Sequence, residues 1–317
     1  MELIESTVHY TEVKCKSIIH NFNKKHLPFR WGANPYRGCE HSCPYCFARY
    51  THEYLGYNTE SDFENIIHVK MNAPKILEKE LSKQKWRMEN VNLGSVCDPY
   101  QPAEKKYEIT RQLLNVFLKC ENSIFIGTKS NLVTRDIDIL AEMAKRNLVR
   151  VNFTITTLDE NIRSRIEPRA PSTKKRIDSI KQLTDKSVIV DILFMPIFPY
   201  LTDNIENLNG VVKEVREAGA RYIVPGILNL KSSCKKRVLD LISHDFPKLY
   251  KKYLNIYKRT YAPKNLSSKI YRVIKTARAK YRVNKSERHV LMRMQTILEN
   301  WITKQTVLTS NQTCSIK

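Results

Sequence analysis

The stretch Cys39-Glu-His-Ser-Cys43-Pro-Tyr-Cys46 places three cysteines within one short run, while the other five cysteines of the chain stand singly. In a reducing compartment, C-x3-C-x2-C spacing is typical of a metal or iron–sulfur site rather than of a disulfide framework. Structural zinc would need a fourth ligand, for which His41 or His52 are candidates. A cubane cluster held by three thiolates instead leaves one iron open for an exogenous ligand. The stretch predicts a metal site, with both alternatives open.

Around this stretch the chain alternates short β-branched runs with longer amphipathic runs, which is typical of a parallel sheet wrapped by helices. Strands are predicted at 29–34, 91–96, 124–128, 149–156, 188–195 and 222–228, with a short extra strand at 66–70. Helices are predicted at 73–84, 105–119, 136–146, 173–183 and 205–218. Six repeated βα units predict an α/β fold, either an open doubly wound sheet or a complete or partial barrel.

Polar residues collect where the predicted strands end, and the cysteine stretch itself follows the first strand. The candidates are Ser95, Asp98, Thr128, Lys129, Thr154 and Thr156. Ligands bind at the carboxyl ends of the strands in parallel α/β folds. We therefore expect a ligand site there.

Charge is concentrated toward the end of the chain. Of 54 Lys and Arg against 32 Asp and Glu in 317 residues, residues 231–317 hold 21 basic and 4 acidic ones. A basic region beside a nearly balanced body suggests a polyanionic partner, nucleic acid first, although solvated lysine faces give the same count. We expect an N-terminal extension at 1–26, a core barrel at 27–230 and a basic, Tyr-rich helical region at 231–317.

Within the basic region, four aromatic residues recur at helical spacing: Phe246, Tyr250, Tyr253 and Tyr257. A stripe of this kind predicts packing against the body of the protein more than a base-stacking platform.

Several function classes lack support in the sequence. Apolar runs fall short of the roughly 20 residues of a membrane helix, and the first residues do not read as a secretory signal, so we expect a cytoplasmic protein. Walker A, G-x-G-x-x-G and H-E-x-x-H motifs are absent. A second close group of cysteines is also absent, which argues against an auxiliary cluster.

Five blocks of sequence together resemble the radical S-adenosylmethionine superfamily, whose signature is C-x3-C-x-aromatic-C. The blocks are Asn34 to Arg49, Asp98 to Glu104, Thr128-Lys-Ser130, Arg135-Asp136 and Glu167-Pro-Arg-Ala-Pro171. More narrowly, the chain is similar to the spore photoproduct lyase branch, often labelled DNA repair photolyase. The resemblance implies a partial (β/α)6 TIM-like barrel, a [4Fe–4S] cluster, S-adenosylmethionine, and an electron donor such as flavodoxin or ferredoxin.

The resemblance also implies roles for individual residues. Cys39, Cys43 and Cys46 match the iron ligands, and Tyr45 matches the aromatic residue that backs the adenine. Lys129 matches a lysine that pairs with the methionine carboxylate, a role that suits a point charge. Thr154 matches a serine that meets the ribose, and Thr156 follows it on the same strand face. A β-branched residue facing the barrel interior would equally explain Thr154.

The second strand departs from the lyase pattern. Aligned on Asp98, the chain has Ser95 where the lyase has the cysteine that returns a hydrogen atom, and Cys97 stands two positions later. A hydroxyl O–H bond is too strong to replace a thiol in this role. Cys97 is a candidate for a displaced hydrogen donor, a cofactor contact or a small buried hydrophobe.

Two carboxylates have open alternatives. Asp98 could contact the ligand or form a turn with its own backbone. Glu167, in a proline-bracketed loop with Arg169, could present its carboxylate to the ligand, or the loop could simply cap the next helix through Ser172 and Thr173.

The sequence therefore predicts an enzyme that cleaves S-adenosylmethionine to a 5′-deoxyadenosyl radical and acts on nucleic acid. Two alternatives remain. One is the same chemistry on a protein, peptide or small molecule, and the other is a non-catalytic, metal-bound nucleic-acid-binding protein. Burial of the tyrosine stripe would favour the first alternative.

Overall fold

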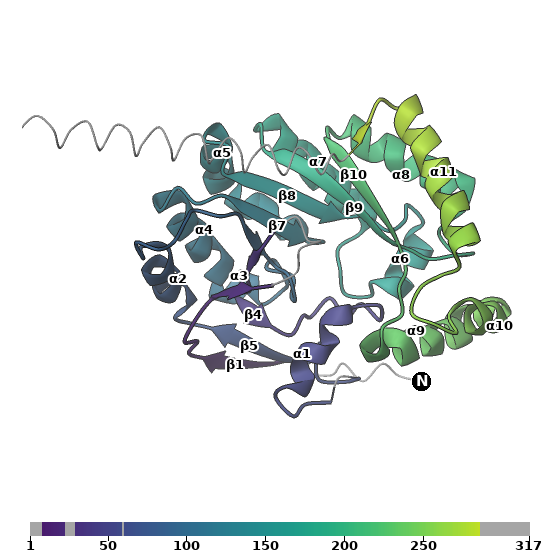
Figure 1. Ribbon diagram of the computed structural model, residues 1–317, viewed down its shortest axis with the longest axis horizontal. Helices are drawn as coiled ribbons and strands as arrows, with labels where there is room; N and C mark the ends of the chain where they lie inside the picture. Colours follow the sequence, from purple (N-terminus) through teal and green to yellow (C-terminus); the bar gives the residue numbers. More distant parts are fainter. Residues whose placement is uncertain (1–7, 23–28, 59, 286–317) are drawn as a thin grey trace, which may run out of the picture.

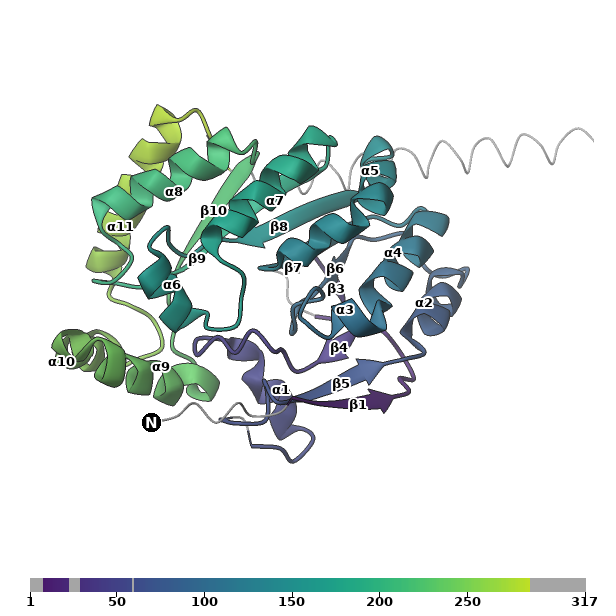
Figure 2. The same ribbon diagram turned by 180° about the vertical axis from the view of Figure 1, so that it is seen from behind.

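The computed structural model describes residues 8–22, 29–58 and 60–285, and Figures 1 and 2 show it from two sides. The strands are β1 (His9–Val13), β2 (Ile19–Asn21), β3 (Trp31–Ala33), β4 (Tyr36–Arg37), β5 (Ile66–Lys70), β6 (Val91–Leu93), β7 (Ile124–Thr128), β8 (Val149–Thr154), β9 (Ile189–Ile197), β10 (Tyr222–Ile227) and β11 (Asn284–Lys285). The α-helices are α1 (Tyr50–Glu53), α2 (Ala73–Leu81), α3 (Glu104–Tyr107), α4 (Ile109–Lys119), α5 (Ile137–Lys145), α6 (Glu160–Ile166), α7 (Thr173–Asp185), α8 (Ile205–Glu217), α9 (Ser232–Asp245), α10 (Pro247–Ile256) and α11 (Lys264–Lys280). Two 3-10 turns, η1 (Phe47–Arg49) and η2 (Asn131–Asp136), precede α1 and α5.

The main sheet confirms the partial (β/α)6 barrel. Its order is β11-β10-β9-β8-β7-β6-β3-β2, and the six strands from β3 to β10 within it run parallel. Among the described residues its two edge strands pair with no further strand, so the barrel stays open. The helices α2, α4, α5, α7, α8 and α11 lie along its outer side (Figures 1 and 2). A second sheet, β1-β5-β4, flanks the connection that carries the three cysteines, and β5 occupies the predicted extra strand at 66–70.

Polarity alternates along β8 as a two-sided sheet requires, although nearly all of its residues are buried. On β8, Val149, Val151 and Phe153 are all at most 2% exposed. Residues on the other face of the same strand include Arg150 and Asn152, so the helix-covered side is apolar and the lumen side is polar. The barrel interior is therefore the polar face.

The backbone shortens one predicted strand and interrupts one predicted helix. The strand predicted at 91–96 stops at Leu93, because Gly94 has a φ of +91° and a Cβ there would lie 2.5 Å from Pro99 Cδ. Ser95 and Cys97 therefore lie in a loop and do not share a strand face. The helix predicted at 105–119 is broken into α3 and α4 at Glu108, whose φ is +51°. The sequence analysis also missed α6.

Sheet pairing crosses both of the expected domain boundaries. Near the N-terminus, β2 pairs with β3, and near the end of the described chain, β11 pairs with β10. The division at 26 and 230 stays a prediction. Residues 286–317 of the basic region lie outside the described residues.

The aromatic stripe of the basic region packs against the barrel. Tyr253 and Tyr257 are at most 1% exposed, and their hydroxyls donate to Pro199 O and Leu228 O, both at 2.8 Å. The predicted packing stripe is thus confirmed for these two tyrosines. No described helix has the length and apolar character needed to cross a membrane.

Candidate active site

The cysteine loop runs between β4 and η1, at the carboxyl end of the parallel strands. Cys39 and Cys43 are buried, Cys46 is half-buried, and all three are free thiols. Burial raises the pKa of Cys39 well above its usual value and that of Cys43 to about 12. Each of these two thiols is close enough to the other thiols of the loop to act on them electrostatically. A metal that accepts thiolates would offset the cost of charge here.

The donor set fits a three-thiolate cluster better than a closed zinc site. His41 Nδ1 lies 3.2 Å from Asp98 Oδ2, and His52 Nε2 lies 3.0 Å from Ile66 O, so both histidines have other partners. Within the part of the chain that the structure describes, no three His, Cys, Asp or Glu side chains come together as ligands of a single metal ion. The loop therefore supplies three thiols and lacks a fourth protein ligand among these groups.

Protein contacts hold the shape of the cysteine loop. Gln101 Oε1 accepts from Glu40 N at 3.0 Å, and Gln101 Nε2 donates to Gly38 O at 3.1 Å. The carboxylate of Glu40 accepts from Ala103 N at 2.7 Å and from the Tyr10 hydroxyl at 3.0 Å. Two blocks of sequence that lie far apart, around Glu40 and around Gln101, thus form one hydrogen-bonded unit.

Asp98 joins this unit to the end of β7. Its carboxylate accepts from Tyr100 N at 2.9 Å, Thr128 Oγ1 at 2.7 Å and Lys129 N at 2.7 Å, and it faces His41. Burial alone would raise the pKa of Asp98, but His41 and Lys129 lower it to about 2. Because a carboxylate has about four acceptor positions, these contacts saturate it. The predicted contact of Asp98 with a ligand stays a prediction.

A second charged group connects Tyr45 to the end of β8. Lys129 Nζ lies 5.6 Å from the centre of the Tyr45 ring, and the Tyr45 hydroxyl donates to Glu167. Glu167 Oε2 lies 2.6 Å from Arg176 Nη2, with both side chains fully buried, and Arg176 Nη1 donates to Thr154 O at 3.0 Å. The predicted site residues Tyr45, Lys129, Thr154 and Glu167 therefore belong to one connected set.

The charges of this set reinforce one another. Burial would raise the pKa of Glu167, but Arg176 and Lys129 lower it. Burial would lower the pKa of Lys129, but Cys43, Glu167 and Asp98 raise it. Lys129 is thus a cation at physiological pH. Helix α7 is capped at its amino end by Ser172 Oγ, which accepts from Lys175 N at 3.3 Å. The Glu167 carboxylate pairs with Arg176 instead of capping this helix.

Thr156 has a buried hydroxyl without a partner in the described part of the chain. Its side chain is 0% exposed and its Oγ1 makes no hydrogen bond there. A buried unsatisfied hydroxyl destabilises a protein unless something else satisfies it. The predicted contact of Thr156 with a ligand stays a prediction.

Ser95 and Cys97 share one partner, Asn34. Asn34 Nδ2 donates to Ser95 Oγ at 2.9 Å, and Cys97 Sγ lies 3.7 Å from Asn34 Oδ1. Cys97 is 6% exposed, and burial raises its pKa to about 12. It is packed as a small hydrophobe with one weak hydrogen bond. Its role as a hydrogen donor stays a prediction.

Arg176, Gln101 and Asn34 are the site residues that the sequence analysis did not identify. For Arg176 a signal exists, because it stands on the same helical stripe as the buried Ile180 and Leu183 of α7. An arginine on an apolar stripe must have a buried partner. Gln101 and Asn34 lie inside the blocks of sequence that resemble the superfamily. Their spacing, however, does not distinguish an amide that shapes a loop from any other amide.

The family model that matches this chain is the Radical SAM superfamily, over residues 33–209. The chain belongs to this superfamily, whose members use a [4Fe–4S] cluster and S-adenosylmethionine. It is therefore an enzyme with radical S-adenosylmethionine chemistry.

Relatives and solved structures agree with this assignment. The uncharacterized protein Rv2578c of Mycobacterium tuberculosis is 32% identical over 86% of this chain and 81% of its own length. The uncharacterized protein MJ0683 of Methanocaldococcus jannaschii is 30% identical over 78% and 87%. A spore photoproduct lyase mutant with bound AdoMet and dinucleoside spore photoproduct covers 86% of this chain and 79% of its own, with a TM-score of 0.63 and 12% identity. This last likeness is one of fold.

Proposed function

We propose that Cys39, Cys43 and Cys46 hold a [4Fe–4S] cluster whose open iron binds S-adenosylmethionine. The observation that carries the proposal is the electrostatic contact of Cys43 and Cys46 with Lys129, and of Cys43 with Glu167, at the carboxyl end of the parallel strands. When bound, the cluster supplies one electron to the sulfonium of S-adenosylmethionine, which gives methionine and a 5′-deoxyadenosyl radical.

The protein's own side chains bind and orient the cofactor in this proposal. Lys129, a cation held beside the Tyr45 ring, pairs with the methionine carboxylate. Tyr45 is fixed by its hydrogen bond to Glu167 and supports the adenine. The free hydroxyl of Thr156 and the side chain of Thr154 meet the ribose. The Glu167–Arg176 pair acts as a positioning pair, because it holds Tyr45 from behind.

The test is reductive cleavage of S-adenosylmethionine. After anaerobic reconstitution and reduction with dithionite, we expect about four irons per chain and formation of 5′-deoxyadenosine. Cys43→Ala should lose both, whereas the matched variant Cys120→Ala, at the end of α4 and away from the loop, should retain both. Zinc in place of iron, or a full cluster without cleavage, would overturn the proposal.

We propose nucleic acid as the substrate class. The described part of the basic region, 231–285, holds 17 Lys and Arg against 2 Asp and Glu, and a protein of like fold was solved with a dinucleoside lesion. Phosphate neutralisation by Lys and Arg makes affinity fall steeply with salt. We expect salt-dependent binding of DNA or RNA, and 5′-deoxyadenosine formation that rises when the correct nucleic acid is present. Absence of nucleic-acid binding at low salt would remove this substrate class.

One observation favours a second candidate, the same chemistry on a protein, peptide or small molecule. Tyr253 and Tyr257 are buried against the barrel, so the basic region serves in part as a structural wrap and these rings are not available for stacking on bases. Indifference to nucleic acid combined with intact cofactor cleavage would establish this candidate.

A further inference from the structure

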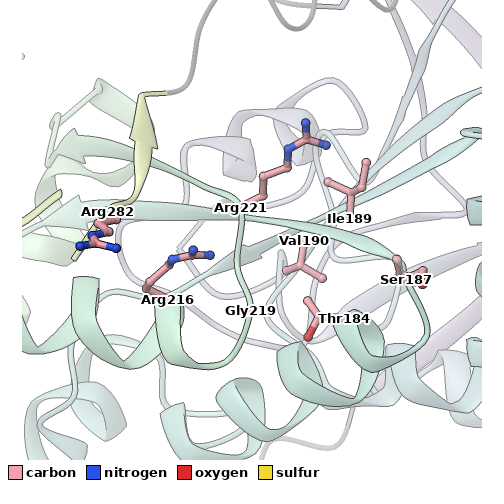
Figure 3. A pocket seen from close by; sticks show the side chains of 9 residues that line it. Thr184, Ser187, Ile189, Val190, Arg216, Gly219, Arg221 and Arg282 are labelled. Atoms are coloured by element: carbon pink, nitrogen blue, oxygen red, sulfur yellow. The ribbon is translucent and has the colours of Figure 1, made fainter. Parts of the chain in front are cut away.

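A pocket of about 270 Å³ opens at the amino-terminal ends of β9 and β10, the end of the barrel opposite the cysteine loop (Figure 3). Three arginines from separate elements line it: Arg216 from the last turn of α8, Arg221 just before β10, and Arg282 between α11 and β11. Thr184 and Ser187 contribute hydroxyls, and no acidic residue is among those lining the pocket. The charged side chains of its lining are therefore all positive.

These three arginines are exposed and none forms an ion pair within the described ranges 8–22, 29–58 and 60–285. The guanidinium of Arg221 lies over the ring of Tyr222 in a cation–π arrangement, at 5.3 Å from the ring centre, and it acts electrostatically on the buried Asp191. Some other surface arginines of this protein do find carboxylates, as Arg146 does with Glu142 at 3.0 Å. The pocket thus gathers cations whose hydrogen-bond donors are still available.

Helix capping does not account for the arginines. The ends of α7 and α8 lie at the pocket, and helix carboxyl ends attract cations. Here no hydrogen bond from the three guanidinium groups to these helix ends is found among the described residues, and backbone groups take part of the capping: Val188 N donates to Leu183 O at 3.1 Å and Ala220 N donates to Val215 O at 2.9 Å. The guanidinium groups remain for a ligand from outside the chain.

The pocket lies at one end of a longer basic surface. Helix α11 packs on α8 through Ile270, Ile274 and Ala277, and it carries six Lys and Arg with no acidic residue. It runs along the side of the barrel (Figure 1). Its 17 residues span roughly 25 Å, and Arg282, just after the helix, lines the pocket. A single small anion would need only the pocket. A polyanion would also use the helix.

We propose that the Arg216, Arg221 and Arg282 pocket binds a backbone phosphate of nucleic acid that lies along α11. Guanidinium groups suit this ligand, because their forked donors match phosphate oxygens. The site is separate from the cofactor and anchors the nucleic acid at a distance from the radical chemistry. The inference rests on the nucleic-acid substrate class proposed above, and it adds a residue-level site to it.

The experiment compares two triple variants of the full, reconstituted chain by fluorescence anisotropy with a short labelled DNA duplex and the matching single strand. The pocket variant is Arg216→Gln, Arg221→Gln and Arg282→Gln. The control removes the same charge at exposed lysines elsewhere: Lys75→Gln, Lys105→Gln and Lys174→Gln. We expect about tenfold weaker binding by the pocket variant than by the control, and a plot of log affinity against log salt that is flatter by roughly 2 to 3 units for duplex DNA.

Equal affinity and equal salt dependence of the two variants would overturn the pocket, while nucleic-acid binding and 5′-deoxyadenosine formation by the wild type would leave the proposed function standing. Lack of DNA binding by the wild type would overturn both the pocket and the substrate class. A calorimetric titration with inorganic phosphate, in which only the pocket variant loses binding while DNA affinity is unchanged, would overturn the nucleic-acid assignment in favour of a small phosphorylated ligand. Each variant should retain the wild-type rate of uncoupled 5′-deoxyadenosine formation, because the pocket is remote from the cysteine loop.

Discussion

Two groups of charges at opposite ends of the barrel, the Glu167–Arg176 pair and the three arginines of the pocket, differ in burial and pairing. At the carboxyl ends of the strands, charges are buried and paired, as in Glu167 and Arg176 at 2.6 Å with both side chains 0% exposed. At the amino ends, Arg216, Arg221 and Arg282 are exposed and make no ion pair with the described residues. Buried pairs hold side chains in one geometry, whereas exposed cations keep their donors available. The first arrangement suits a resident cofactor and the second an exchanging ligand.

The largest expected effect is the loss of one partner of the buried pair. Arg176→Met leaves Glu167 buried without its cation, which should reduce the free energy of unfolding by about 3 to 5 kcal/mol. The control, Arg165→Met, breaks the Arg165–Asp245 pair at 2.9 Å, whose arginine is 51% exposed, and should cost less than about 1 kcal/mol. Urea denaturation measures both. Equal losses would show that the two kinds of pair do not differ.

Acidification should change the free energy of unfolding in opposite directions through two buried carboxyl groups, Asp191 and Asp98. Burial raises the pKa of Asp191, near the start of β9, to about 6, although Arg150 and Arg221 oppose this. Since the unfolded chain releases this proton near pH 4, the folded state binds more protons between about pH 4 and 6, and stability falls as pH rises through this range. Asp98, with a pKa of about 2, instead loses its contribution as pH falls from about 4 to 2.

Removal of the Asp191 carboxylate tests this contrast. In the wild type, the free energy of unfolding should decrease by about 2 to 3 kcal/mol between pH 4 and 6, and Asp191→Asn should abolish this decrease. Asp98→Asn should leave that decrease in place and alter the acid side below pH 4. Denaturant titrations across the pH range give both slopes, and an unchanged slope in Asp191→Asn would contradict the assignment.

A smaller change in stability is expected when the buried hydroxyl of Thr156 is removed. Thr156→Val removes a buried Oγ1 that has no partner in the described part of the chain, so the protein without ligand should gain about 1 kcal/mol of stability. The same change should weaken S-adenosylmethionine binding several-fold. Thermal unfolding with and without the cofactor measures the two consequences. A loss of stability without ligand would show that the hydroxyl already has a partner.

The smallest expected effect concerns the wrap of the basic region. Tyr253→Phe removes the hydrogen bond to Pro199 O and should cost about 1 kcal/mol. Tyr271→Phe, at a residue that is 43% exposed, should cost almost nothing. Proteolysis of the region after residue 230 would follow the same order if packing rather than charge holds it in place.

The parallel barrel could be predicted from periodicity because each βα unit repeats the same burial pattern, as β7 and β8 illustrate at their predicted positions. The ends of the strands could not be predicted in the same way. Strand β6 ends where Gly94 approaches Pro99 closely, and the periodicity of the strand does not encode this contact. The cysteine loop could be identified from its spacing as a candidate metal or iron–sulfur site. The residues that shape their loop, such as Gln101, act through long-range hydrogen bonds, for which local sequence carries no period.

The contacts of Glu40 and Gln101 bear on how the cofactor is acquired. A loop whose backbone is tied to distant segments has part of its shape set by the protein's own contacts, in contrast to small zinc domains that fold only around their metal. In the function proposed above, iron and sulfide would therefore be added to a loop that hydrogen bonds within the polypeptide already organise.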